Sequence, residues 1–368
     1  MLYKEEDEEL FYRLALTFVP GIGAKTGRNL LEHFGSATKV FNAPIKELRH
    51  IDGIGDTKVK GFKEAGVMQK AEAELAFVQK NGIEVLMHGT PKRLSNCSDA
   101  PLLLYYKGNA KVDTARDVAI VGTRKNTEYG QRLCEELIEG LRPIENLLVV
   151  SGLALGIDAI AHKKSVQMGI PTIGVLGHGL DRIYPFTNKQ LAAQMVENGG
   201  LLTEFPKGTQ PERSNFPMRN RIVAGISDVT VVVESNIAGG ALITALMASG
   251  YNREVAAYPG RVTDARSAGC NEIIRTNIAA MVTKPSELIE MMGWADGKKP
   301  KAIQKQLFLD LSSEEQKVID ILQSKETVHS DELYHQTGMP SSQLAATLLQ
   351  LEMMGLVKTL PGKNYRMN

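Results

Sequence analysis

Short glycine-containing motifs in the middle of the chain combine close backbone approach with positive charge. Gly122-Thr123-Arg124 follows the apolar run Val118–Val121, and Ser151-Gly152 follows a second apolar run. Glycine lets the backbone approach a ligand closely, and the first turn of the helix that follows offers free N–H groups to a phosphate. The Arg124 guanidinium can grip that phosphate with a fork of N–H donors. These motifs predict a site for a phosphate-bearing ligand.

Three later segments add cations and flat side chains: Tyr184-Pro185-Phe186, Phe216 to Arg221, and Gly239-Gly240. Sequence-tolerant binding of single-stranded nucleic acid requires cations for the backbone and aromatic faces for the bases, and each stacked base contributes about 1–3 kcal/mol. We therefore predict that all these segments form one binding site. Its candidate residues are Gly122, Thr123, Arg124, Ser151, Gly152, Asp158, Tyr184, Phe186, Lys189, Phe216, Arg219, Asn220, Arg221, Gly239, Gly240 and Thr244.

Two of these candidates compete for one position. Arg219 and Arg221 are two residues apart on a predicted helix, so their side chains diverge and cannot easily face the same ligand. For either residue the alternative is an internal ion pair with a buried carboxylate.

Other residues are candidates for catalysis or metal binding. Asp158 and His162 share a face of a predicted helix, but no third metal ligand follows at a convincing spacing. A structural hydrogen bond that holds the glycine-rich turn is the favoured interpretation, with polar contact to DNA second. Ser151 lacks the GxSxG elbow of a serine nucleophile, and neither a GxGxxG nor a GxxxxGK[ST] motif occurs. We predict no catalytic residue, no metal and no cofactor.

The elements that position these residues alternate between apolar strands and helices. Continuous apolar runs are typical of parallel strands that are buried on both faces, and strand–helix alternation indicates a doubly wound sheet. The fold class predicted for this segment is α/β, with a Rossmann-like doubly wound parallel sheet. The predicted strands are 102–106, 118–121, 147–150, 172–176, 229–233 and 255–257, and helices are predicted over 129–141, 157–168 and 241–249.

The two ends of the chain follow different patterns. Near the N-terminus Val19–Gly23 and Ile51–Gly55 repeat a short glycine-containing hairpin, each followed by a helical stretch, over 25–34 and 57–65. This repeat resembles a tandem helix–hairpin–helix (SAM-like) module, a type common in DNA-binding proteins. Its phosphate contacts, if it binds DNA, would be Lys25, Arg28, Lys58 and Lys60.

Near the C-terminus Ser312 and Glu315 form a predicted capping box. Helices over 313–323, 331–336 and 342–354, followed by a β-hairpin over 355–366, predict a winged helix. The predicted domains are a helical domain over 1–85, a Rossmann-like domain over 86–295, a linker over 296–310 and a winged helix over 311–368.

The bulk composition excludes several classes of protein. The formal net charge is only +1, so affinity for nucleic acid must come from a local patch. The three cysteines, Cys97, Cys134 and Cys270, are far apart and form no CxxC pair, which argues against a disulfide framework or a zinc site. The sequence shows no signal core and no apolar run long enough to span a bilayer. We expect a cytoplasmic protein that does not bind membranes.

The middle segment closely resembles the DNA-processing protein A family (DprA/Smf) in the strings SGLALGIDAIAHKKS, GHGLDRIYPFTN, FPMRNRIVAGISD and GGALIT. The helical N-terminal domain and the winged helix also match that family. The resemblance implies a mediator that binds single-stranded DNA in a basic pocket, dimerises through the Rossmann-like domain and loads the RecA recombinase. In naturally transformable bacteria it implies protection of incoming single strands.

The resemblance also assigns particular positions. The phosphate-gripping arginine of the family falls on Arg124, in its Gly-Ser/Thr-Arg triplet. A basic residue often follows the Tyr-Pro pair in the family, whereas this chain has Phe186 there. Either Lys189 substitutes for that contact or Phe186 stacks on a base.

Two other functions remain as alternatives. The first is a nucleotide phosphoribohydrolase of related Rossmann-like fold, whose PGGxGTxxE loop carries a catalytic glutamate. The corresponding stretch here, Ala238–Thr244, has no glutamate soon after it. The second is a transcriptional regulator that reads duplex DNA through the winged helix. Its predicted recognition helix has no Arg or Lys, which leaves Lys358, Lys363 and Arg366 of the hairpin as phosphate contacts.

Overall fold

The computed structural model describes residues 5–295, 311–323, 325, 327–354, 356–360 and 362–367. These residues form two compact units, one within residues 1–295 and the other within 296–368. The predicted linker over 296–310 lies outside the described residues. No helix among the described residues combines the length and the apolar character needed to cross a bilayer.

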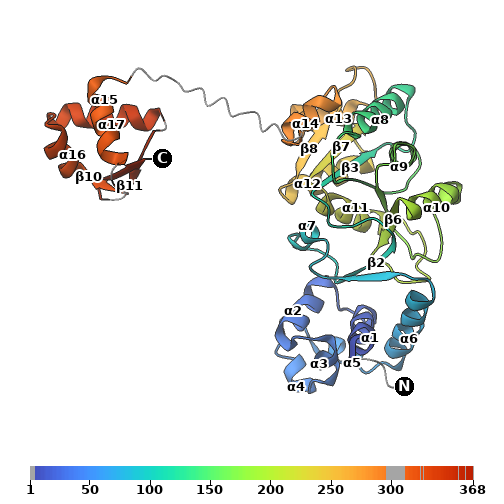
Figure 1. Ribbon diagram of the computed structural model, residues 1–368. Coiled ribbons are helices and arrows are strands. Elements are labelled where there is room, and N and C mark those ends of the chain that lie inside the picture. Colours follow the sequence, from blue (N-terminus) through green and yellow to red (C-terminus); the bar gives the residue numbers. More distant parts are fainter. Residues whose placement is uncertain are drawn as a thin grey trace. The chain divides into compact units, whose positions relative to one another are not determined.

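A nine-stranded sheet forms the centre of the first unit (Figure 1). From β3 to β9 its members run parallel, as the apolar runs predict, and their order is β6-β5-β4-β3-β7-β8-β9. The first two strands extend one edge in antiparallel pairing. The strands are β1 (Glu84–Met87), β2 (Leu103–Gly108), β3 (Arg116–Gly122), β4 (Leu147–Ser151), β5 (Thr172–Val175), β6 (Gly199–Thr203), β7 (Val229–Glu234), β8 (Glu254–Ala257) and β9 (Ala280–Met281).

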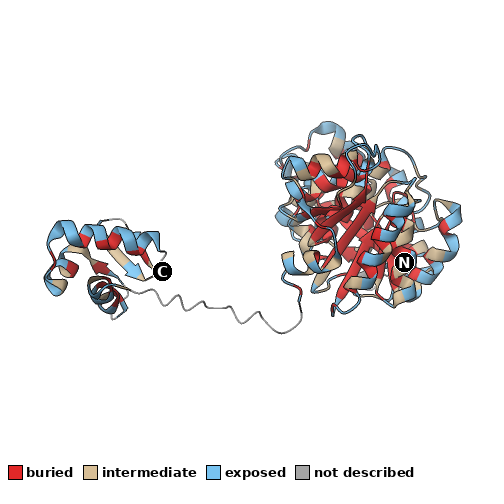
Figure 2. Ribbon diagram, turned by 90° about the horizontal axis from the view of Figure 1, so that it is seen from above, coloured by how far each residue is buried: buried red, intermediate tan, exposed pale blue. Residues whose placement is uncertain are grey.

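Helices cover both faces of the parallel strands, and Figure 2 shows the strands buried between them. Alternation along β3 sends Val118 and Ile120 to one face and Ala119 and Val121 to the other. The first face packs against α8 (Glu128–Leu141), α9 (Ile157–Met168) and α14 (Pro285–Met291). A smaller core on that side includes α10 (Lys189–Glu197), which follows the short η1 (Phe186–Asn188). The second face packs against α7 (Lys92–Ser95), α11 (Asn215–Ile226), α12 (Gly240–Gly250) and α13 (Ala268–Arg275).

The sheet differs from the sequence prediction in the direction of one strand and in three strands that were not predicted. The strand predicted at 102–106 exists as β2 but runs antiparallel. The strands β1, β6 and β9 were not predicted. The strand β6 begins with two glycines, and it needs both of them. A Cβ on Gly199 would meet the backbone of Thr172, and one on Gly200 would meet the ring of Tyr106.

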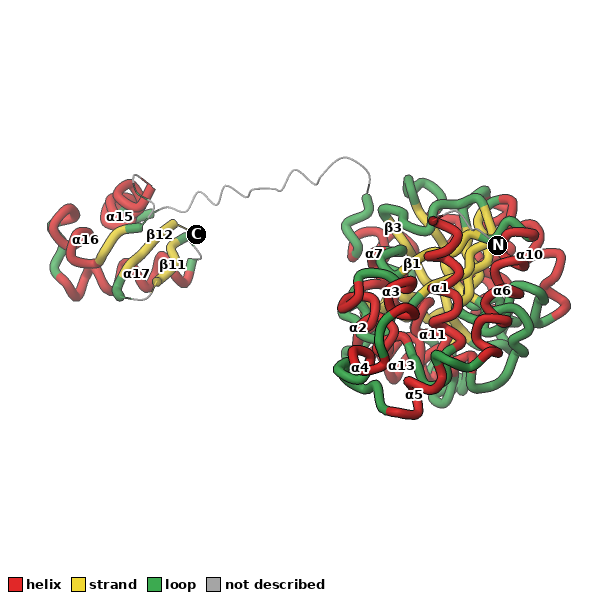
Figure 3. The backbone as a smooth tube through the Cα atoms, turned by 90° about the horizontal axis from the view of Figure 1, so that it is seen from below, coloured by secondary structure: helices red, strands yellow, loops and turns green. Residues whose placement is uncertain are grey.

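The helical N-terminal region packs on the antiparallel edge of the same unit, and its helices lie together in Figures 1 and 3. Their core includes Leu102, Leu103 and Tyr105 of the β2 region. Gly21 and Gly53 adopt φ values of +78° and +83°, as the predicted hairpins require. The second hairpin helix is shorter than predicted, because it ends at Gly61. The helices are α1 (Glu5–Phe18), α2 (Ala24–Phe34), α3 (Ala37–Asn42), α4 (Ile45–Leu48), α5 (Asp56–Gly61) and α6 (Ala65–Lys80).

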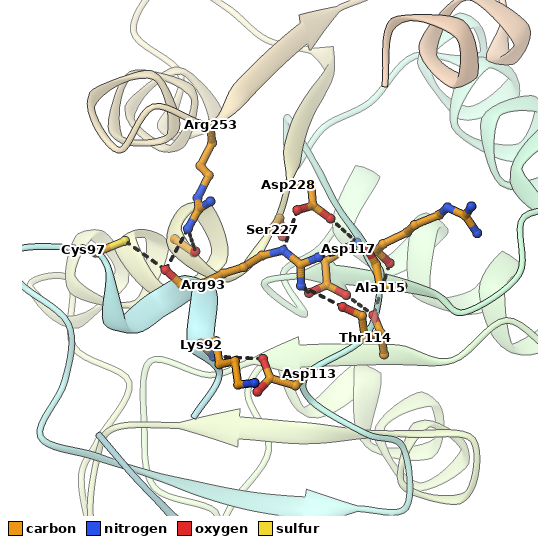
Figure 4. A network of polar contacts seen from close by, with 12 residues as sticks. Lys92, Arg93, Cys97, Asp113, Thr114, Ala115, Asp117, Ser227, Asp228 and Arg253 are labelled. Atoms are coloured by element: carbon orange, nitrogen blue, oxygen red, sulfur yellow. Dashed lines mark hydrogen bonds and ion pairs between the residues drawn. The ribbon is translucent and has the colours of Figure 1, made fainter. Parts of the chain in front are cut away.

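A network of charged groups joins α7 to the starts of β3 and β7 (Figure 4). The Arg93 guanidinium contacts Asp117 at 2.7 Å and Asp228 at 2.5 Å, and it donates to the carbonyls of Thr114 and Ala115. Burial raises the pKa of Asp117 to about 7. This network holds α7 against the end of the sheet at which the parallel strands begin.

The second unit is the predicted winged helix. Its helices are α15 (Ser313–Gln323), α16 (Ser330–Thr337) and α17 (Ser341–Met353), and its sheet has the order β10-β12-β11. The capping box is confirmed, because the Ser312 N–H donates to Glu315 at 2.7 Å and the Glu315 N–H donates to Ser312 Oγ at 3.2 Å. The strands are β10 (Val328–His329), β11 (Val357–Leu360) and β12 (Asn364–Met367).

Candidate functional site

The strand order reverses between β3 and β7, and the glycine motifs lie at that point. The chain moves outward from β3 to β6 on one side and then returns to place β7 on the other side of β3. In open α/β sheets such a reversal leaves a crevice beyond the carboxyl ends of the strands, where ligands bind. The pairing of β3 with β7 shifts register between Val121 and Gly122, at the mouth of this crevice.

Arg124 lies just beyond β3 and is exposed. Its guanidinium carbon is 5.2 Å from the centroid of the Phe216 ring, a cation–π arrangement that holds the side chain over the crevice. Among the residues that the structure describes, no carboxylate lies within ion-pair distance of Arg124. Its guanidinium donors are therefore available to an anion.

Close backbone packing explains why glycines line this crevice. A Cβ on Gly122 would come well under 3.0 Å from Ile157, and one on Gly152 would meet the guanidinium of Arg219 equally closely. Gly156 has a φ of +78°, and a Cβ there would meet the backbone carbonyl of Thr123. The loops after β3 and β4 are thus packed against each other without intervening side chains.

Arg219 is a buried cation below the crevice, with an exposed fraction of only 5 %. Its Nη1 donates to the carbonyls of Gly152 and Val175, and its Nε donates to Asn220 Oδ1 at 3.1 Å. Burial lowers the pKa of Arg219 to about 10, although the charge of Asp158 opposes this shift. Arg219 therefore ties together the loops that carry the glycines while keeping positive charge beneath them.

Asp158 is also buried, at the start of α9. Its Oδ2 accepts the N–H of Ala154 at 3.3 Å, and burial raises its pKa while the charge of Arg219 lowers it. Asp158 thus holds the glycine-rich turn and partly neutralises Arg219.

Arg221 points elsewhere on α11. Its guanidinium forms an ion pair with Glu204 and donates to the carbonyl of Asp99 at 2.5 Å, and the residue is 8 % exposed. This is the internal ion pair weighed from the sequence, and it arises because side chains two apart on a helix diverge. We leave Arg221 out of the proposed site.

The crevice opens as a main groove of about 720 Å³, which unites most of the predicted residues. A side pocket of about 50 Å³ adjoins it, lined in part by Leu155, His178 and Tyr184. The Tyr184 and Phe216 rings are 6.2 Å apart. The predicted residues in the main groove are Gly122, Thr123, Arg124, Gly152, Asp158, Phe216, Arg219, Asn220, Gly239, Gly240 and Thr244.

Three further predicted residues do not line either cavity. Ser151 is fully buried, and its hydroxyl donates to the carbonyl of Ile120 at 2.6 Å. Phe186 is 74 % exposed, and the Lys189 ammonium lies 5.5 Å from its ring centroid. These two form an exposed pair on η1 and α10, outside the groove lining.

The groove also contains cations that the sequence analysis missed, namely Lys125, Arg213 and Arg266. Lys125 is the neighbour of Arg124, and Arg213 lies two residues before α11, so closeness to the recognised motifs could have indicated both. Arg266 comes from the loop after β8, and its guanidinium donates to the carbonyl of Lys125. Only the folded chain shows that contact.

His162 does not form an acid–base pair with Asp158. Its Nδ1 lies 2.7 Å from Thr172 Oγ1, and complete burial lowers its pKa to about 3. No group of three His, Cys, Asp or Glu side chains that could hold a metal ion occurs in the described part of the chain.

The chain is similar to known proteins in each of its three parts. Residues 85–293 match the family model "DNA recombination-mediator protein A", residues 304–363 match the "DprA winged helix domain", and residues 13–62 match the "SAM-like Helix-hairpin-helix tandem". The chain is 30% identical to Protein Smf of Synechocystis, with 98% of this chain and 99% of that protein covered. It is 35% identical to the putative DNA processing protein DprA of Mycobacterium tuberculosis over 75% of this chain and 71% of that protein.

Two solved structures are similar as well. DNA processing protein A from Streptococcus pneumoniae has a TM-score of 0.67 and 32% identity, over 79% of this chain and 98% of that one. DNA processing protein A from Helicobacter pylori, whose structure describes a single-stranded DNA binding mode, has a TM-score of 0.53 and 30% identity, over 57% of this chain and 95% of that one.

Proposed function

Because the chain belongs to the DNA recombination-mediator protein A family, whose members mediate recombination and are not enzymes, we propose that its main groove binds single-stranded DNA. The observation that carries this proposal is the convergence of cations on one groove. Asp158 is the only carboxylate among the residues that line it. The lining cations are Arg124, Lys125, Arg213, Arg219 and Arg266.

The groove and its side pocket also contain side chains that suit a flexible single strand. Arg124 presents donors to phosphate, and the Phe216 and Tyr184 rings beside it present faces to bases. Electrostatic contact with the backbone and stacking on rings together give binding that tolerates any sequence. The relative from Helicobacter pylori supports the same ligand class.

Finer parts of the proposal rest on the family. We infer that the protein acts in the cytoplasm, protects single strands that enter during natural transformation, loads RecA on them and works as a homodimer through its Rossmann-like unit. The phosphoribohydrolase alternative is disfavoured, since the groove offers no glutamate to act as its catalytic group.

Titration of a labelled oligo(dT) with the wild type and Arg124→Ala, at several salt concentrations, tests the proposal. We expect Arg124→Ala to weaken binding about tenfold for every sequence and to reduce the salt slope by about 0.7, because one phosphate contact is lost. Arg142→Ala is the matched control, since Arg142 is an exposed arginine at the far end of α8. Equal affinity of the wild type and Arg124→Ala would remove Arg124 from the site.

A further inference from the structure

A second hollow adjoins the main groove. It has a volume of about 960 Å³ and lies between the loop 259–267 and the start of α8. Arg266 lines both cavities. Its guanidinium donates to the carbonyl of Lys125, the neighbour of Arg124, so it stands at the junction between them.

The hollow is lined by the same kinds of side chain as the main groove, namely arginines and an aromatic ring. Tyr129 is 37 % exposed, and its hydroxyl donates to the carbonyl of Pro259 at 2.8 Å, which fixes the position of the ring. Arg132 has a side chain that is 67 % exposed and lies 4.0 Å from Glu136, at the limit of an ion pair. Arg261 is exposed as well. The hollow therefore combines one aromatic face with three arginines, counting Arg266.

The two carboxylates that line the hollow do not balance its three arginines. Glu234 is 1 % exposed, and its oxygens accept the N–H of Thr127 at 2.9 Å and the hydroxyl of Thr127 at 2.7 Å. It is thus engaged in holding the N-terminus of α8. Asp264 is the remaining carboxylate of the lining. Positive charge prevails on the surface that a ligand would meet.

We propose that a single strand bound in the main groove continues past Arg266 into this second hollow. Arg132 and Arg261 contact its phosphates there, and Tyr129 stacks on a base. This inference rests on the proposed function, because it extends the same strand. It predicts that the hollow contributes only when the strand is long enough to reach it.

The test compares oligo(dT) strands from about 4 to about 16 nucleotides, the range of site sizes of single-strand-binding folds. For the double variant Arg132→Ala/Arg261→Ala we expect unchanged affinity for the shortest strand and about tenfold weaker binding of the longest. The salt slope for the longest strand should fall by about 1.4, since each phosphate contact on a single strand contributes about 0.7. Thr263→Lys, which adds a cation to the same lining, should strengthen binding of the longest strand alone.

The matched control is Arg116→Ala/Arg142→Ala. It removes the same charge near the opposite end of the parallel strands, where β3 begins and α8 ends. A similar loss in this control would reduce the effect to bulk charge and overturn the inference. Wild-type binding by Arg132→Ala/Arg261→Ala at every length, or equal weakening at every length, would overturn it too. Failure of the proposed function looks different, because Arg124→Ala would then bind like the wild type even for the shortest strand.

Discussion

A methyl group added at Gly152 should disrupt the hydrogen bonds of Arg219 below the groove. In Gly152→Ala the new Cβ would come well under 3.0 Å from the Nη1, Nη2 and Cζ atoms of Arg219, so the guanidinium must move. It would then lose its bonds to the carbonyls of Gly152 and Val175. Overpacking of a core costs about 1–3 kcal/mol, and each hydrogen bond of a charged group contributes about 1.5–3 kcal/mol. We expect a destabilisation of at least about 4 kcal/mol, because the lower ends of these ranges already reach that value when both hydrogen bonds are lost.

The assay can follow the first unit separately. The chain has one tryptophan, Trp294, which is 6 % exposed in the core formed with α8, α9 and α14. Its fluorescence during urea unfolding therefore reports on that unit. Gly240→Ala is the matched control, because Gly240 lines the same groove at the start of α12 and a Cβ there meets nothing within 4 Å. Unfolding of Gly152→Ala within about 0.5 kcal/mol of the wild type would falsify the account of Arg219, since changes that small are usual for surface sites.

Two further predictions concern a buried histidine and the ion-pair network of Arg93 in the first unit. Burial holds the pKa of His162 at about 3, below its ordinary 6.5. Between these two pH values the histidine is protonated in the unfolded chain and neutral in the folded one. The free energy of unfolding should therefore fall as the pH drops from about 6.5 towards 3, by up to about 1.4 kcal/mol per pH unit. Urea unfolding at several pH values should show that the stability of His162→Gln depends less steeply on pH than that of the wild type. An unchanged pH dependence would contradict the lowered pKa of His162. Arg93→Ala should cost about 3 kcal/mol in the same fluorescence assay, because it leaves Asp117 and Asp228 facing each other without their cation. Arg93→Lys should recover part of that loss, since it keeps the charge but not the fork of donors; a loss under about 1 kcal/mol in Arg93→Ala would show that the network is dispensable.

Much of the fold follows from local sequence patterns. The central strands are continuous apolar runs. The helices α9 and α15 have the predicted bounds, because glycines flank α9 and a capping box begins α15. The β6 strand escaped prediction because tertiary contact, not propensity, places glycine at Gly199 and Gly200. The antiparallel direction of β2 escaped for a related reason, since direction depends on the strand that it pairs with.

The site was predictable to the extent that its residues stand next to recognisable motifs. Arg124, Gly152 and Phe216 do so, and the structure brings them together in one groove. Arg219 and Arg221 have equivalent positions in the sequence, yet one lies under the groove and the other pairs with Glu204. The position of the acceptors decides between them. These acceptors lie in β5, in the residues that directly follow β4 and β6, and in the loop before β2.

The charge balance of the groove favours an external anion. A buried cation such as Arg219 requires compensation, and Asp158 is the one carboxylate in the lining to provide it. The exposed Arg124, Lys125, Arg213 and Arg266 have no such carboxylate beside them in that lining. The whole chain carries a net charge of only +1, so no broad field attracts a polyanion, and screening confines each charge to about 8–10 Å. Under the proposed function, affinity therefore arises from direct phosphate contacts, which is why removal of a single arginine should change both the binding constant and its salt slope.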